Sequence, residues 1–293
     1  MTCTNIDRLP RGARMKTLED KEALMKLQQF ALNRIIAPQL GILEFIDLAN
    51  QANFQAVELR NDLKGKTVTD GLKPLQVEQA ASVASVHIAT INALQRFNEK
   101  PKNHKKELED LLKVGKALGC EAIVLCPVNG IAVDDDRSRW HDRCVEALIT
   151  YADLFGEYGL LGYVEPLGFA VSSLRTKEEA LRAIRESGKG SQYKLVHDTF
   201  HHYLGGESGF YPKETGLVHI SAVVGQKPIA SIQDSDRVLL SPSDIISSQT
   251  QVKALVEGGY KGYLSFEPFS KDVQQAPLET LLQQLDESRS LLS

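Results

Sequence analysis

The sequence of 293 residues has few features that would indicate binding to a nucleic acid or a membrane. It contains no run of about 18 apolar residues that could span a bilayer, and its first residues lack the apolar core of a secretory signal. The net charge is −4, and basic residues do not gather in blocks. This charge pattern argues against a nucleic-acid partner. We therefore expect a cytoplasmic protein, and the charge is compatible with a small neutral or anionic substrate.

Cysteine is scarce, and the glycine motifs of nucleotide-binding folds are missing. The four cysteines form no C-x-x-C pair, which argues against a zinc knuckle or a redox-active dithiol. Cys120 and Cys126 lie in apolar surroundings, and we expect both to be buried, reduced thiols. No predicted strand runs into a G-x-G-x-x-G or P-loop pattern. The usual nucleotide-binding reasons for a doubly wound open sheet are therefore absent.

One supersecondary pattern recurs along the chain. A helical stretch ends at Gly or Asn, and a short apolar strand follows that ends in a polar residue, as in LANQANFQAVELR and VEGGYKGYLSFEP. Eight such strands are predicted, at residues 30–33, 56–59, 85–91, 122–126, 160–165, 194–198, 217–220 and 262–267. Eight β/α units predict a single-domain (β/α)8 TIM barrel, with a doubly wound open sheet as the alternative. We place the barrel domain at residues 28–293 and an N-terminal extension at residues 1–27, where Met15 could also begin the chain.

Polar residues end most of the predicted strands, at the face where TIM barrels hold their active sites. They are Asn33, Arg60, Asn92, Glu165, Asp198, His219 and Glu267. Three carboxylates and an imidazole on consecutive strands would form a mixed oxygen and nitrogen site suited to Mn²⁺, Mg²⁺, Co²⁺ or Zn²⁺. Any single acid could instead cap a helix or pair with a loop cation. The remaining three, Asn33, Arg60 and Asn92, are predicted to bind substrate.

The histidines near these strands are expected to differ in role. His201 follows Asp198 by three residues, and we expect it to contact substrate from above the cavity rather than to bind a metal. Its neighbour His202 is expected to point away. By strand alternation, His197 should face the surrounding helices. His87 lies early in its strand and is predicted to be a hydrogen-bonded residue near the opposite end of the barrel.

Several of these segments together resemble a known family. YVEPLG, LVHDTFHHYLGG, LVHISAVV with DSDRV, and YLSFEPFS resemble the xylose isomerase-like TIM barrels, a group of sugar phosphate isomerases and epimerases. The resemblance extends from about residue 30 to residue 275. It implies that His201 and Arg237 contact the substrate and that a divalent metal is held by Glu165, Asp198, His219 and Glu267. The sequence departs from many relatives at Ser221 and Ala222, and in the LLSPSDII segment after Arg237.

The resemblance implies an isomerase or epimerase of a polyhydroxy ketone, such as an inosose or a ketose sugar. Glu165 and Glu267 would move the proton next to the carbonyl, and the metal would stabilise the enediolate. A dehydratase would use nearly the same site. A DNA-repair endonuclease would need further histidines where this chain has Arg60, Asn92 and Cys126, and a non-catalytic sugar-binding protein would be expected to lose the ligands. A homodimer remains open.

Overall fold

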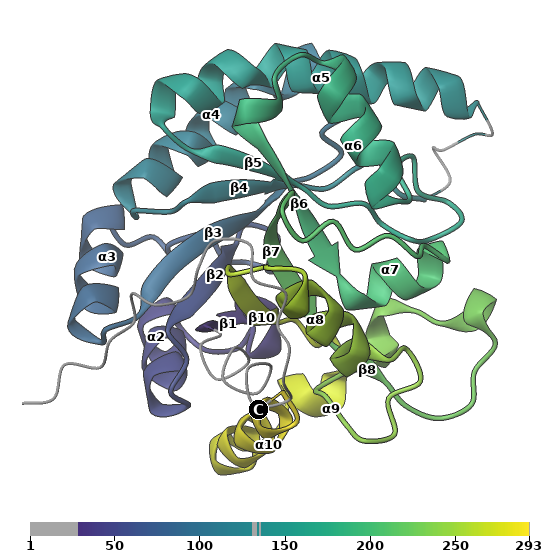
Figure 1. The fold of residues 1–293 in the computed structure, drawn as a ribbon. Helices are drawn as coiled ribbons and strands as arrows, with labels where there is room; N and C mark the ends of the chain where they lie inside the picture. Colours follow the sequence, from purple (N-terminus) through teal and green to yellow (C-terminus); the bar gives the residue numbers. More distant parts are fainter. Residues whose placement is uncertain (1–28, 131–133, 135, 293) are drawn as a thin grey trace, which may run out of the picture.

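Eight parallel strands close into a barrel (Figure 1) in a computed structural model that describes residues 29–130, 134 and 136–292. Each barrel strand pairs with its neighbours in sequence, and β1 closes the ring by pairing with β10. The strands are β1 (Gln29–Asn33), β2 (Ala56–Arg60), β3 (His87–Leu94), β4 (Ala122–Leu125), β5 (Leu161–Val164), β6 (Tyr193–Asp198), β7 (Thr215–Ile220) and β10 (Tyr263–Phe266). The single-domain TIM barrel is confirmed. The N-terminal extension predicted for residues 1–27 lies outside the described residues.

Helices surround the barrel (Figure 1) and bury their apolar faces against the strands. They are α2 (Ile42–Gln51), α3 (Pro74–Val83), α4 (Pro101–Ala117), α5 (Arg137–Tyr158), α6 (Lys177–Glu186), α7 (Thr199–Gly205), α8 (Ser248–Glu257), α9 (Lys271–Gln274) and α10 (Leu278–Ser290). The long helix α5 ends because Gly159 takes the left-handed conformation that closes many helices. None of the helices in the described part of the chain has the length and apolar character needed to cross a membrane.

The side chains inside the barrel change along its axis from small apolar residues to polar ones. Ala31, Ala56 and Ala89 pack together with Tyr263 toward the amino-terminal ends of the strands. Larger apolar side chains follow, and polar side chains gather where the strands end. Burying a polar group costs free energy unless the group is paired. A concentration of buried polar side chains at one end of the barrel therefore indicates a candidate functional site there.

A small antiparallel pair of strands lies outside the barrel and was not predicted. Directly after β7, strand β8 (Ala222–Val223) pairs with β9 (Arg237–Val238). Backbone N–H groups of Phe269 and Ser270 donate to the carbonyl oxygen of Arg237 at 3.0 and 2.8 Å. The two-residue strand β9 is therefore fixed beside the loop that follows β10, which brings Arg237 to the carboxyl ends of the barrel strands.

All eight predicted barrel strands are present, with shifts at their ends. The largest is in β3, which was predicted at residues 85–91 and runs from His87 to Leu94. Asn92 consequently lies inside this strand and not after it. The sequence returns to apolar residues after Asn92, at Ala93 and Leu94, and β3 pairs with β2 through Asn92 and with β4 through Leu94.

Candidate metal and active site

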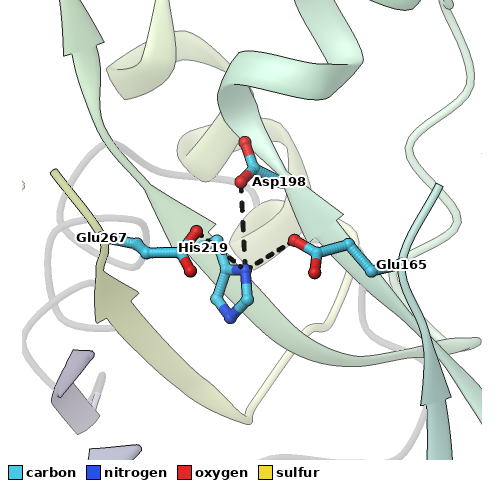
Figure 2. A group of neighbouring side chains, drawn as sticks. All are labelled: Glu165, Asp198, His219 and Glu267. Atoms are coloured by element: carbon cyan, nitrogen blue, oxygen red, sulfur yellow. Dashed lines mark hydrogen bonds and ion pairs between the residues drawn. The ribbon is translucent and has the colours of Figure 1, made fainter. Parts of the chain in front are cut away.

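Four side chains meet at the carboxyl ends of the barrel strands (Figure 2). Asp198 ends β6, and the strand register places it directly beside His219 of β7. Glu165 follows β5, and Glu267 follows β10. All four are buried, and one potential ligand atom from each lies within 4.8 Å of the others. The structure thus brings together the four residues singled out in the sequence, and we call them the four-residue cluster.

His219 lies at the centre of the four-residue cluster (Figure 2). Its Nδ1 is 2.8 Å from Glu165 Oε1, 3.3 Å from Glu267 Oε2 and 3.9 Å from Asp198 Oδ2. Ligand atoms that are each about 2.1 Å from one ion lie at most about 4.2 Å apart. Shifts of a few tenths of an ångström would therefore let these atoms share one ion. Carboxylate oxygens with one imidazole nitrogen fit a divalent metal.

Burial and mutual charge shift the pKa values of the four-residue cluster in different directions. Burial raises the pKa of Glu267 to about 7, although His219 and Arg237 oppose this. Burial also opposes ionisation of Glu165, but the neighbouring His219 brings the pKa of that carboxyl below its usual value. Burial disfavours the charged imidazole, yet the surrounding carboxylates hold the pKa of His219 well above its usual range. The cluster thus attracts positive charge strongly, as a cation site requires.

Glu267 is held by residues that were predicted to bind substrate. Its Oε1 accepts from Arg60 Nη1 at 2.8 Å, from Asn33 Nδ2 at 3.1 Å and from Asn92 Nδ2 at 3.4 Å. Its Oε2 accepts from Arg237 Nη2 at 2.8 Å. Arg60 and Asn92 also line the cavity above, whereas Asn33 is fully buried and lies away from its wall. In this arrangement the four donors fix the orientation of Glu267.

Arg237 contacts the four-residue cluster directly. Its Nη2 donates to Asp198 Oδ2 at 2.7 Å as well as to Glu267, and its Nε donates to Ser221 Oγ at 3.0 Å. The guanidinium packs between the rings of Phe200 and Phe269, with its central carbon 4.9 and 4.7 Å from their centres. Ser221 thus supports the arginine. Contact between Arg237 and a substrate remains a prediction.

A cavity of about 160 Å³ opens above the four-residue cluster. Polar side chains form part of its wall, and Leu167, Phe169 and Phe269 also line it. His201 lines it from α7, with its ring edge-on to Phe169 at 5.2 Å between centres. Its buried Nδ1 has no hydrogen-bond partner among the described residues. A small cavity with convergent polar groups and an apolar wall suits a small polar molecule that has C–H faces.

The other histidines face away from the cavity. His202 Nδ1 lies 2.7 Å from Lys177 Nζ, which is paired with Glu207 at 2.6 Å. His197 Nε2 lies 3.0 Å from the side chain of Gln251 on α8, so it faces the helices as predicted. His87 was expected to be a hydrogen-bonded core or bottom-layer residue, but its side chain is 39% exposed and lies 3.7 Å from Glu121. It sits where the barrel opens to solvent.

Two residues near the four-residue cluster were not given a role from the sequence. Glu58 lies inside β2, fully buried, and its carboxylate is 3.1 Å from His219 Nε2. The available signal was strand alternation, because Glu58 precedes Arg60 by two residues and so shares its inward face. Cys126 is a buried free thiol, as predicted, as is Cys120. Its Sγ donates to Glu165 Oε2 at 3.3 Å.

A closed parallel barrel with three carboxylates and an imidazole at its carboxyl end defines a TIM barrel with a candidate metal site. The family model of the xylose isomerase-like TIM barrels matches residues 46–291, and the chain belongs to this family. A solved xylose isomerase domain containing protein from Salmonella typhimurium LT2 is 38% identical. That likeness covers 91% of this chain and 97% of the other, with a TM-score of 0.83.

More distant structures share the fold. The IOLI protein, solved with a bound zinc atom, is 20% identical over 91% of this chain and 98% of its own, with a TM-score of 0.80. D-psicose 3-epimerase, solved in the presence of D-fructose, is 14% identical over 90% of this chain and 97% of its own, with a TM-score of 0.64. No curated protein matches the chain.

Proposed function

We propose that this protein is a divalent-metal-dependent isomerase or epimerase of a polyhydroxy ketone, an inosose or a ketose sugar. The observation that carries the proposal is the four-residue cluster of buried acids and one histidine beneath a small cavity lined by both polar and apolar side chains. The zinc atom of the IOLI protein and the sugar epimerase activity named for D-psicose 3-epimerase support it. The proposed partner is a small polyol or keto sugar, and neither a nucleic acid nor a membrane; a homodimer remains open.

In this proposal Glu165, Asp198, His219 and Glu267 hold one ion of Mn²⁺, Mg²⁺, Co²⁺ or Zn²⁺. When bound, the ion would neutralise the negative charge that develops on the substrate oxygens. Its place is supported by the spacing of the four ligand atoms, all within 4.8 Å of one another.

The proton chemistry falls to the two glutamates. Glu165 and Glu267 follow the fifth and eighth barrel strands, on either side of His219 (Figure 2). One carboxylate would remove the proton from the carbon beside the carbonyl, and the other would return a proton. His201 would donate to a substrate oxygen, and Arg237 would hold a more distant hydroxyl. Arg60 and Asn92 line the same cavity and could add further contacts.

The first prediction concerns metal content. Protein purified without chelator is expected to contain about one divalent ion per chain, because the cluster offers one set of ligands. Elemental analysis measures this, and His219→Gln, which removes the central nitrogen, should lower the content strongly. A structure determined in metal-containing buffer with these four side chains pointing apart would contradict the prediction.

The second prediction concerns Arg237. Arg237→Ala is expected to lower kcat/KM by about 30- to 1,000-fold, roughly 2–4 kcal/mol, because a buried charge-assisted hydrogen bond to substrate is lost. Metal content should persist, because arginine cannot be a ligand and the ligands that it contacts keep other donors: Arg60 and Asn33 on Glu267, and the backbone N–H groups of Phe200 and His201 on Asp198. Arg96→Ala is the matched control, because Arg96 pairs with Glu99 on the surface. If metal content collapses in Arg237→Ala, the arginine supports the ligands and its assignment to substrate is wrong.

A substrate screen distinguishes the proposed reaction from its nearest alternative. Inososes and ketoses are incubated with the metal-loaded protein, and products are separated by chromatography. An isomer or epimer of the substrate supports the proposal. Release of an ultraviolet-absorbing enone would instead identify a dehydratase that uses the same four-residue cluster.

A further inference from the structure

Glu58 is a carboxylate sealed inside the barrel, with an exposed fraction of 0%. The strand register places it beside Asn33 of β1 and Thr90 of β3. Thr90 Oγ1 donates to it at 2.6 Å, Asn33 Nδ2 donates at 3.4 Å, and the hydroxyl of Ser265 also donates. Donors from neighbouring strands thus hold this carboxylate in one orientation.

His219 stands between Glu58 and the other acids of the site. Its Nδ1 is 2.8 Å from Glu165, whereas its Nε2 is 3.1 and 3.2 Å from the two oxygens of Glu58. Figure 2 shows Nδ1 turned toward the three carboxylates and the other ring nitrogen turned away from them. A neutral imidazole carries its proton on one nitrogen and offers the lone pair of the other. Glu58 accepts a hydrogen bond only from a protonated Nε2, which leaves Nδ1 free for a ligand.

We propose that Glu58 is a positioning residue of the metal site, which accepts the Nε2–H of His219 and so presents an unprotonated Nδ1 to the ion. The inference rests on the proposed function, because it requires a metal at the four-residue cluster. An acceptor behind a metal-binding histidine fixes both its tautomer and its ring orientation. Thr90 and Ser265 keep Glu58 from turning aside.

The test measures metal affinity. The metal-free protein is titrated with Zn²⁺ in competition with a chromophoric chelator, and Glu58→Gln is expected to bind about 10- to 100-fold more weakly than the wild type. Glutamine has nearly the same shape but a weaker acceptor. The matched control is Thr90→Val, which removes one of three donors to the same carboxylate, while Asn33 and Ser265 still hold it and the His219 contact stays in place. It should stay within about threefold of the wild type.

Nitrogen-15 NMR of the wild-type protein loaded with Zn²⁺ gives a second measurement, which does not require Glu58→Gln to fold. The His219 signals, identified by their absence in His219→Gln, are expected to show a protonated Nε2 and an unprotonated Nδ1. A purely structural role for Glu58 would not dictate this tautomer. In folded Glu58→Gln the same signals should shift, because the acceptor of the Nε2–H is weaker.

The outcomes separate this inference from the proposed function. If the wild type binds one Zn²⁺ and Glu58→Gln binds it within about threefold as tightly, the positioning role is overturned and the metal site stands. A protonated Nδ1 in the metal-loaded wild type overturns it as well. A wild type that binds no Zn²⁺ at the four-residue cluster overturns both the inference and the proposed function.

Discussion

Glu267→Gln and Glu165→Gln are each expected to lower turnover by about 10²- to 10⁴-fold, the usual contribution of a positioned general base. Glutamine is nearly isosteric with glutamate and still offers one oxygen to a metal, but it cannot accept the proton. Both variants should therefore keep at least part of their metal. Glu121→Gln is the control, because Glu121 lies half-exposed beside His87 and away from the four-residue cluster. Steady-state kinetics on the substrate found by the screen, together with elemental analysis, checks these expectations.

Solvent deuterium tests the mechanism behind that prediction. If the glutamates pass a proton to and from carbon, product formed in D₂O should carry deuterium at the reacting carbon. The alternative is a metal-assisted hydride shift, which moves hydrogen without exchange. Mass spectrometry that finds no deuterium in the product, together with glutamine variants that retain near-normal turnover, would contradict the proton-transfer assignment.

Glu207→Gln is expected to destabilise the protein by about 3–5 kcal/mol, because it leaves a buried cation without its partner. Glu207 pairs with Lys177 at 2.6 Å, and their side chains are only 7% and 4% exposed. It also accepts from the backbone N–H groups of Lys177 and Glu178 at the start of α6. Denaturant unfolding followed by circular dichroism measures the loss. The exposed pair Glu109–Lys113 gives the control Glu109→Gln, which is expected to leave the free energy of unfolding nearly unchanged.

The stability contributed by Glu207 should depend on pH in a defined direction. Burial opposes its ionisation, but His202 and Lys177 lower the pKa of this carboxyl from 4.5 to about 2. A carboxyl whose pKa is lower in the folded state stabilises the protein above the unfolded pKa and loses that contribution as the pH falls. The difference in the free energy of unfolding between wild type and Glu207→Gln should be largest near pH 7. It should shrink as the pH falls below about 4.5. A difference that grows on acidification would contradict this assignment.

Most of the barrel could be predicted from the sequence because the signals for its strands and helices lie within each element. Each strand is a short apolar run that ends in a polar residue, and each helix has its own spacing and end signals. Once the strands are parallel, their carboxyl ends must share one face. That topological fact is sufficient to bring residues as distant as Glu165 and Glu267 together.

The parts that escaped prediction depend on contacts between distant segments. Asn33 ends its strand, yet its amide donates to Glu58 of the neighbouring strand and to Glu267, which lies near it because barrel closure pairs β1 with β10. Glu58 looked like one acid within an apolar strand, and its importance depends on His219, 161 residues away. The position of Arg237 depends on the pairing of β8 with β9. Each of these strands has only two residues, too few for the alternation that predicts a strand from sequence.

The β8–β9 pair also bears on how such a protein can diversify. Arg237 reaches the cavity from a segment that takes no part in the eight-strand ring, and the stretch between β8 and β9 joins them outside the barrel. Substitutions and length changes in that stretch would alter which hydroxyl groups a ligand must present, while the strand ladder and the acids at its end stay as they are. Under the proposed function, substrate preference could therefore change in this stretch without altering the barrel, and relatives with different substrates are expected to differ first between β8 and β9.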